Sequence, residues 1–309
     1  MRWRGALVRH NTDGLLVILG SLLTLIDDLI TGFDDFKLSE SEELNIHKKV
    51  KPETHPSVKR KKSRKRLESQ DTEYTKTARQ KLWEINEWLD KADITVDQSY
   101  LKTPVNPHQR RLHRTFNNRT FDNGGRLVGG FWIPLSKDQR AVSIRINGDP
   151  VCYLDYGQMG LRLLYGHLKA VPPDNEDLYD VPASPGGREG DKKLISSAIY
   201  ATEPQKKYPK GVRELAGCHG PYWLVMNEIG EYHSAVADHF YKGLGVKLMR
   251  KESDVMIELL LELKMQNISA LPIHDGDLVA EEVHEQVIEI MKTVFEDCVG
   301  VSAVVNIED

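Results

Sequence analysis

The chain has 309 residues, 40% of them hydrophobic and 28% charged, and its formal net charge is −4 at pH 7. This length allows a large buried core, and the composition argues against a fibrous or wholly disordered chain. Three widely spaced cysteines, Cys152, Cys218 and Cys298, argue against a disulfide framework and favour a reducing compartment.

Residues 1–45 are predicted to form an apolar helix with an acidic tail. Residues 15–26 are strongly apolar and follow a basic start, as in a signal peptide. However, Asp27 and Asp28 come next, no small-x-small cleavage site follows, and the run is shorter than the ~20 residues that cross a bilayer. We therefore expect a buried helix and no membrane partner, with membrane anchoring as the alternative.

Residues 46–72 are predicted to form a basic, flexible linker. KRKKSRKR, which spans residues 59–66, places positive charges at all but one position. Like charges at this density resist packing and attract polyanions, so we expect nucleic acid as a partner. The alternative is a linker that only confers solubility. The candidate contacts are Lys59, Arg60, Lys61 and Lys62.

A helical region is predicted over residues 73–125. Leu82, Ile85, Trp88 and Leu89 follow the spacing of one buried helix face. Residues 126–309 are compositionally continuous and large enough for one catalytic domain.

A first β-hairpin is predicted near the middle of the chain. Residues 142–146 alternate apolar and polar side chains, Asn147-Gly148 is a tight-turn signal, and residues 151–155 form a second strand that ends at Asp155. After Gly157 the apolar period becomes helical.

A second hairpin is predicted in residues 270–282, ALPIHDGDLVAEE. It follows an amphipathic helix that Ser253 would cap. Apolar runs flank a tight turn that holds Asp275 and Asp277, and Pro272 indicates a strand at a sheet edge. A final helix and a last strand at residues 301–307 are expected after it.

Asp155 and Asp275 thus stand at the ends of two separate β elements. Carboxylates are costly to bury alone among apolar strands, which makes a bound cation the natural partner. A few hard oxygen ligands suit Mg²⁺ or Mn²⁺, and two such ions ~4 Å apart support an in-line displacement at phosphorus. The alternative is that both acids are ordinary turn residues.

A third segment, GREGDKKLISSAIYATE, is predicted to be a helix with a polar face. Arg188, Lys192, Ser196 and Tyr200 recur every four residues, so they share one broad side of a helix. Two cations and a phenol on one face suit a triphosphate beside a sugar and a base. A merely solvated face is the alternative. A zinc site formed by Cys218-His219 with His233 and His239 is a weaker possibility, because no CxxC pair supports it.

These motifs resemble those of the family A DNA polymerases, of the bacterial DNA polymerase I type. DYGQMGLR resembles motif A, usually DYSQIELR; R-x3-K-x7-Y matches motif B; and IHDGDLV resembles motif C, usually VHDELV. GGRL, residues 124–127, resembles the TGRL segment that precedes motif A. The order is the family's order, and the resemblance covers about residues 110–300.

The resemblance implies an α+β fold, namely a polymerase palm with reduced helical fingers at about residues 170–250 and a thumb-like region at residues 73–125. Two metal ions would bind Asp155, Asp275 and the backbone carbonyl of Tyr156. The other roles that it implies are triphosphate binding by Arg188 and Lys192, nucleotide binding by Ser196, Tyr200 and Gly160, and primer or template binding by Arg126 and His274.

Two departures from the family pattern affect the expected chemistry. Gly160 replaces the glutamate that blocks the ribose 2′-hydroxyl, and single-subunit RNA polymerases are similar here in having glycine, so ribonucleotide use is a hypothesis. Gly276 replaces the motif C glutamate, and Asp277 would supply the missing acid near the metals.

The leading functional hypothesis is a minimal template-directed nucleotidyltransferase without proofreading that extends a primer or starts one. The expected partners are a DNA primer–template, nucleoside triphosphates and, as a variant, RNA; the expected location is intracellular, in the cytoplasm and nucleoid or in a eukaryotic nucleus. The alternatives are a terminal transferase or nuclease that uses the same acids, and a degenerate palm that only binds nucleic acid.

Overall fold

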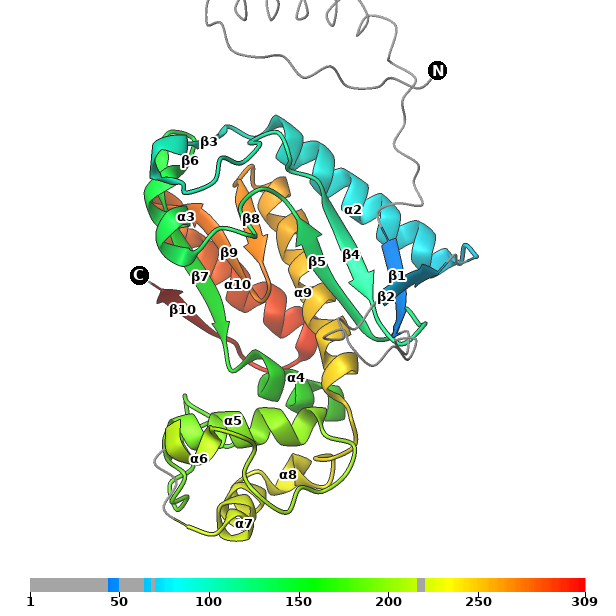
Figure 1. Ribbon diagram of the computed structural model, residues 1–309, viewed down its shortest axis with the longest axis vertical. Coiled ribbons are helices and arrows are strands. Elements are labelled where there is room, and N and C mark those ends of the chain that lie inside the picture. Colours follow the sequence, from blue (N-terminus) through cyan, green and yellow to red (C-terminus); the bar gives the residue numbers. More distant parts are fainter. Residues whose placement is uncertain (1–43, 50–63, 68–69, 216–219, 309) are drawn as a thin grey trace, which may run out of the picture. The chain divides into compact units, whose positions relative to one another are not determined.

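The larger sheet is built around the long strand β7 (Asp149–Gly157). Its order is β3-β6-β7-β9-β8, β10 also pairs with β7, and every pairing is antiparallel (Figure 1). The partner strands are β3 (Ile94–Val96), β6 (Ile144–Ile146), β8 (Ala270–Ile273), β9 (Gly276–Ala280) and β10 (Val304–Glu308).

This computed structural model describes residues 44–49, 64–67, 70–215 and 220–308. These ranges belong to one unit, Glu43–Asp309. The helix predicted in residues 1–45 and the contacts predicted for Lys59, Arg60, Lys61 and Lys62 lie outside the described residues.

A second sheet, in the order β2-β1-β4-β5, corrects two predictions. β1 (Leu44–Lys49) and β2 (Arg64–Leu67) occupy parts of the predicted linker, because Leu44 and Ile46 alternate into the core while the strand pairs with its neighbours. The region predicted to be helical, residues 73–125, contains β4 (Leu112–Phe116) and the start of β5 (Gly124–Gly129). Alternate side chains of β4 are buried, which is the period of a strand rather than of a helix.

Helix α9 (Gly245–Met265) lies at the centre of the packing. It contacts β5, α2 (Glu73–Lys91), α4 (Met159–Leu168) and α10 (His284–Val299). Leu82, Ile85 and Leu89 of α2 are fully buried, as their spacing predicted. The remaining helical turns in this part are η2 (Gln98–Tyr100), α3 (Lys137–Ser143) and η3 (Glu281–Val283).

Four helices form a group beside α4, away from both sheets (Figure 1). They are α5 (Gly187–Tyr200), α6 (Val212–Leu215), α7 (Tyr222–Tyr232) and α8 (Ser234–Ala237). His233, between α7 and α8, joins the group to the core. Its Nδ1 lies 2.9 Å from the hydroxyl of Tyr165 on α4, and its Nε2 lies 2.9 Å from the carbonyl oxygen of Leu178. Because both ring nitrogens are engaged, His233 is not available as a zinc ligand.

Two local predictions were wrong and two were confirmed. Val142 belongs to helix α3, which Ser136 begins with a capping box, rather than to a strand. Ser253 lies inside α9 and not at its start; its hydroxyl bonds the carbonyl of Gly125. The Asn147-Gly148 turn is present, with φ of 54° and 86°, and Pro272 lies on the edge strand β8.

The predicted α+β class, a palm-like antiparallel sheet with helices, is confirmed. No helix in the part of the chain that the structure describes is both long enough and apolar enough to cross a membrane.

Candidate functional site

The strand pairing of β7 with β9 places Asp155 and Asp275 at the same sheet end. Asp155 is opposite Gly276, and the amide of Tyr156 donates a 3.1 Å hydrogen bond to the carbonyl of Asp275. In an antiparallel strand the N–H and C=O of one residue point to the same side, so the Tyr156 carbonyl also points toward Asp275. Two predicted metal-binding carboxylates and the predicted carbonyl thus lie together.

The environment of Asp155 disfavours a charged carboxylate. Burial, and then the charges of Asp275 and Glu308, raise the pKa of Asp155 to about 7, while Lys192 and the Tyr153 hydroxyl act in the opposite direction. Glu308 pairs with Tyr153, two residues before Asp155, and therefore faces the same side of the sheet. Burial and the neighbouring acids thus outweigh the effect of Lys192 on the pKa of Asp155.

Asp277 does not share this site, which corrects the prediction that it supplies a further acid near the metals. It pairs with Leu154, so its side chain lies on the face opposite Asp155. That face is covered by α10, where the Tyr156 hydroxyl donates to the carbonyl of Met291. Asp277 is fully buried, burial raises its pKa to about 7, and its carboxylate has no hydrogen-bond partner among the described residues. This environment favours the neutral, protonated form of the Asp277 carboxyl group.

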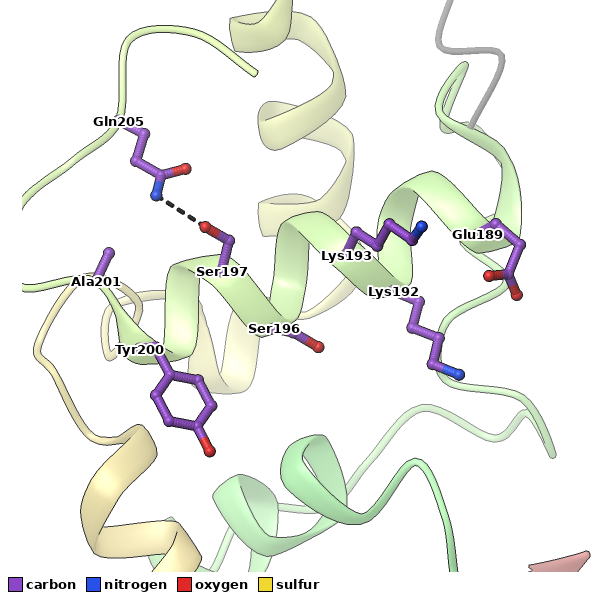
Figure 2. A pocket seen from close by; sticks show the side chains of 8 residues that line it. All are labelled: Glu189, Lys192, Lys193, Ser196, Ser197, Tyr200, Ala201 and Gln205. Carbon is purple, nitrogen blue, oxygen red and sulfur yellow. Dashed lines mark hydrogen bonds between the residues drawn. The ribbon is translucent and has the colours of Figure 1, made fainter. Parts of the chain in front are cut away.

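Helix α5 presents Lys192, Ser196 and Tyr200 on one side (Figure 2). They line a cavity of about 660 Å³, and Lys192 lies within electrostatic reach of Asp155. The Tyr200 ring lies against Gly245 at the start of α9, where an added Cβ would stand 2.4 Å from the ring. The predicted polar face therefore exists and faces the acid pair.

Arg188 differs from the rest of this face. Its guanidinium bonds Asp177 and makes a 2.7 Å contact with Glu189, and its side chain is 47% exposed. The two acids already neutralise it, so Lys192 is the better placed cation for a phosphate.

Arg126 is joined to Glu252 of α9. Its Nε and a terminal nitrogen donate hydrogen bonds of 2.7 and 3.2 Å to the two carboxylate oxygens. Burial lowers the pKa of Arg126, but the bond to Glu252 and the charge of Asp275 outweigh burial and leave the pKa raised. Arg126 thus lies between the buried Glu252 and the acid pair.

A small cavity of about 30 Å³ lies between α4, α5 and α9. Gly160, Ser196, Tyr200 and Glu252 are among its lining residues. A Cβ built on Gly160 would meet no atom within 4 Å, so the missing side chain leaves space beside the α5 face.

His274 occupies the first position of the two-residue turn between β8 and β9. It is exposed and has a φ of 60°, a conformation that glycine adopts more easily. The turn holds Asp275 in place, and the Trp132 indole fixes its first strand by donating to the carbonyl of Pro272 at 3.0 Å.

Three residues near the acid pair were not predicted from the sequence: Tyr153, Glu252 and Glu308. Tyr153 bonds the carbonyl of Ile273 at 2.9 Å and lies 3.5 Å from the Asp155 carboxylate. Alternation along β7 could have placed Tyr153 beside Asp155. Glu252 and Glu308 come from distant elements whose pairing no local pattern indicates.

The donor set at Asp155 and Asp275 fits a magnesium ion. Mg²⁺ uses one or two carboxylates and fills its other positions with water and substrate phosphates. Among the described residues, no three histidine, cysteine, aspartate or glutamate side chains gather as a protein-only metal site. Burial and the charge of Asp275 raise the pKa of Asp155, and a bound divalent cation would favour the charged form of such a carboxylate.

Comparisons with known proteins give a likeness to solved structures and none to a family model or a curated protein. No protein-family model matches the sequence, and no curated protein matches it. Among solved structures, the chain is similar to the polymerase domain of Pol1 from M. smegmatis, which was determined in complex with a DNA primer–template and a dNTP. The identity is 12%, the TM-score is 0.41, and the match covers 76% of this chain and 51% of that one. The chain thus spans about half the length of the structure that it matches.

Proposed function

We propose that this chain transfers a nucleotidyl group from a nucleoside triphosphate to the 3′-hydroxyl of a template-paired primer. The observation that carries the proposal is the joint placement of an acid pair and a cationic helix face. Asp155 and Asp275 meet across β7 and β9, and Lys192 of α5 acts electrostatically on Asp155. Such a pair of elements holds a triphosphate against metal-binding carboxylates.

The residues have distinct roles in this proposal. Asp155, Asp275 and the Tyr156 carbonyl would hold Mg²⁺, which when bound lowers the pKa of the attacking hydroxyl and stabilises the pyrophosphate leaving group. Lys192 would bind the phosphates as a point charge. Tyr200 would carry the base and sugar on its ring, and Arg126 and the exposed His274 would contact the primer strand.

Primer extension tests the proposal directly. With Mg²⁺ and a defined primer–template, the wild-type chain should add the nucleotide that the template specifies. Asp155→Asn and Asp275→Asn should each lower the rate by at least about 10³-fold, because each removes a carboxylate ligand that acts in the transition state. Asp138→Asn, at an exposed position in α3, is the matched control and should retain activity.

The other outcomes separate the alternatives. Addition without a template would indicate a terminal transferase, and cleavage of the primer would indicate a nuclease. Retained activity in either acid variant would show that the two-metal assignment is wrong, whereas nucleic-acid binding without any addition would indicate a degenerate palm.

A further inference from the structure

The phenol of Tyr153 lies between the two strands that lead to the acid pair. Tyr153 stands two residues before Asp155 on β7, so both side chains are on the same face of the sheet. Its hydroxyl donates a 2.9 Å hydrogen bond to the carbonyl of Ile273 and lies 3.5 Å from the Asp155 carboxylate. Ile273 is the last residue of β8, directly before the turn that holds Asp275. One side chain therefore contacts the first acid and the segment that carries the second.

Strand β7 holds this turn through two hydrogen bonds of different kinds. The amide of Tyr156 donates to the Asp275 carbonyl, and the hydroxyl of Tyr153 donates to the Ile273 carbonyl just before the turn. Any residue except proline at position 156 would make the first bond, because it belongs to the backbone. The second bond depends on the tyrosine side chain. The position of Asp275 relative to β7 therefore depends on Tyr153 in a way that a substitution can test.

The neighbouring position on β9 leaves room for the phenol. Gly276 pairs with Asp155, and a Cβ on Gly276 would stand 2.7 Å from the Tyr153 hydroxyl oxygen. A neutral hydroxyl from β7 thus lies where the motif C glutamate was expected. A tyrosine hydroxyl has one proton and gives it to one acceptor at a time. Because the Ile273 carbonyl is the nearer acceptor, the Asp155 oxygens keep their lone pairs for a cation.

We propose that Tyr153 is a positioning residue for the metal site, which holds the Asp275 turn against β7 so that both carboxylates can bind the same cation. This inference rests on the proposed function, because it takes Asp155 and Asp275 as the metal ligands. Removal of a group that holds metal ligands in place commonly lowers metal affinity by about 10–100-fold. Loss of the hydroxyl should therefore weaken the metal site without abolishing it.

Binding of Mn²⁺ to the full chain tests this role without nucleotide or nucleic acid. Mn²⁺ takes the same oxygen ligands as Mg²⁺, and electron paramagnetic resonance distinguishes the free ion from the bound ion. Tyr153→Phe removes only the hydroxyl and should raise the Kd for Mn²⁺ at least about tenfold, with the number of ions bound per chain unchanged. Asp155→Asn should remove this binding, which assigns the signal to the acid pair.

A matched tyrosine controls for the loss of a hydrogen bond. The hydroxyl of Tyr208, between α5 and α6, donates to the carbonyl of Gly220 at 3.0 Å. Tyr208→Phe therefore removes the same kind of bond at a distant place, and it should leave the Kd for Mn²⁺ within about twofold of wild type. Partial unfolding of a variant would lower the number of ions bound per chain, whereas poorer positioning raises the Kd at constant stoichiometry.

The Mg²⁺ dependence of primer extension gives a second measurement. Tyr153→Phe should need at least about tenfold more Mg²⁺ for its half-maximal rate. At saturating Mg²⁺ its rate should approach that of wild type, because both carboxylates are still present. Asp155→Asn should stay inactive at every Mg²⁺ concentration, since a ligand itself is missing.

Failure of the positioning role and failure of the proposed function give different results. A Kd for Mn²⁺ that Tyr153→Phe leaves within about twofold of wild type would overturn the positioning role, even if primer extension proceeds normally. A Kd that rises as expected in a chain whose wild type never extends a primer would support the positioning role and contradict nucleotidyl transfer. Absence of Mn²⁺ binding by wild type, or binding that Asp155→Asn leaves unchanged, would overturn both.

Discussion

Gly276 is the residue where the chain departs most clearly from the motif that it resembles. A Cβ there would stand 2.3 Å from the Leu154 carbonyl oxygen and 2.7 Å from the Tyr153 ring. The space that a glutamate would need is filled by the strand that carries Asp155. The packing of Tyr153 and the Leu154 carbonyl against residue 276 therefore explains why glycine, and not a larger side chain, fits at this position.

Gly276→Ala should destabilise the fold by about 1–3 kcal/mol, because the methyl overlaps backbone atoms that cannot move independently of β7. Urea unfolding measures the change. Tyr153→Phe in the same background should not restore stability, since the nearest obstacle is a carbonyl oxygen of the backbone. Stability equal to wild type would contradict the packing described for this turn.

At the scale of elements, His233 connects the helical group α5–α8 to α4 through a hydrogen bond with Tyr165. Its Nε2 faces a carbonyl and must donate, so Nδ1 accepts from the Tyr165 hydroxyl, and the neutral ring fits the site. Burial lowers the pKa of His233 from 6.5 to about 4. The folded chain therefore binds fewer protons than the unfolded chain between these values.

Stability should decrease as the pH falls from about 6.5 to about 4, with a contribution from His233 of about 3 kcal/mol over that range. Above pH 6.5 this contribution is fully present, because the ring is neutral in both states. His233→Gln should flatten the pH dependence of urea unfolding, whereas His108→Gln, at an exposed histidine, should leave it unchanged. An equally steep profile in His233→Gln would refute this assignment.

The elements also show which features a sequence can predict. Alternation and turn chemistry correctly placed β6, the Asn147-Gly148 turn and the hairpin at Asp275, since each depends on neighbours in the chain. Strands β1 and β2 were missed because β1 pairs with the distant strand β4 and β2 pairs with β1, and no local pattern indicates these pairings. The start of α9 at Gly245 was missed for a similar reason: tertiary packing, rather than a capping side chain, sets it.

For the candidate site too, residues in short motifs could be proposed from the sequence, whereas residues placed by long-range packing could not. Asp155, Asp275, Lys192 and Tyr200, which the structure brings to one end of the sheet, could be proposed from sequence because each lies in a short motif with its own spacing. Asp277 was assigned to the wrong face because its position depends on the register with β7, which is a long-range property. Glu252 was missed because it enters the site from the middle of a helix with an ordinary amphipathic pattern.

At the scale of the whole molecule, a net charge of −4 coexists with a dense basic run at residues 59–66. The last three residues of that run, 64–66, belong to strand β2 (Arg64–Leu67) at the edge of the second sheet. Deletion of the whole segment would therefore remove sheet structure as well as charge. Neutralisation of single side chains is the cleaner test of nucleic-acid binding.

Changing Lys59, Arg60, Lys61 and Lys62 to glutamine should weaken DNA binding and reduce the slope of log affinity against log salt by up to about 4, if each cation contacts one phosphate. Fluorescence anisotropy at several salt concentrations measures the slope. A chain with four exposed lysines changed elsewhere, Lys102, Lys206, Lys207 and Lys210, is matched in charge and should keep a steeper slope. Equal slopes in the two variants would remove the basic run from the binding mechanism.

Strand β7 pairs with β9 through one edge and with β10 through the other, and both partners come much later in the chain. During synthesis on the ribosome, the segment that carries Asp155 therefore emerges long before β9 and β10 can pair with it, and β6 covers only the start of β7. The acid pair can assemble only after the β8–β9 hairpin, which carries Asp275, has been made. Until then the nascent chain exposes an apolar strand with unpaired amides, which makes it a ready substrate for chaperones and a site for aggregation.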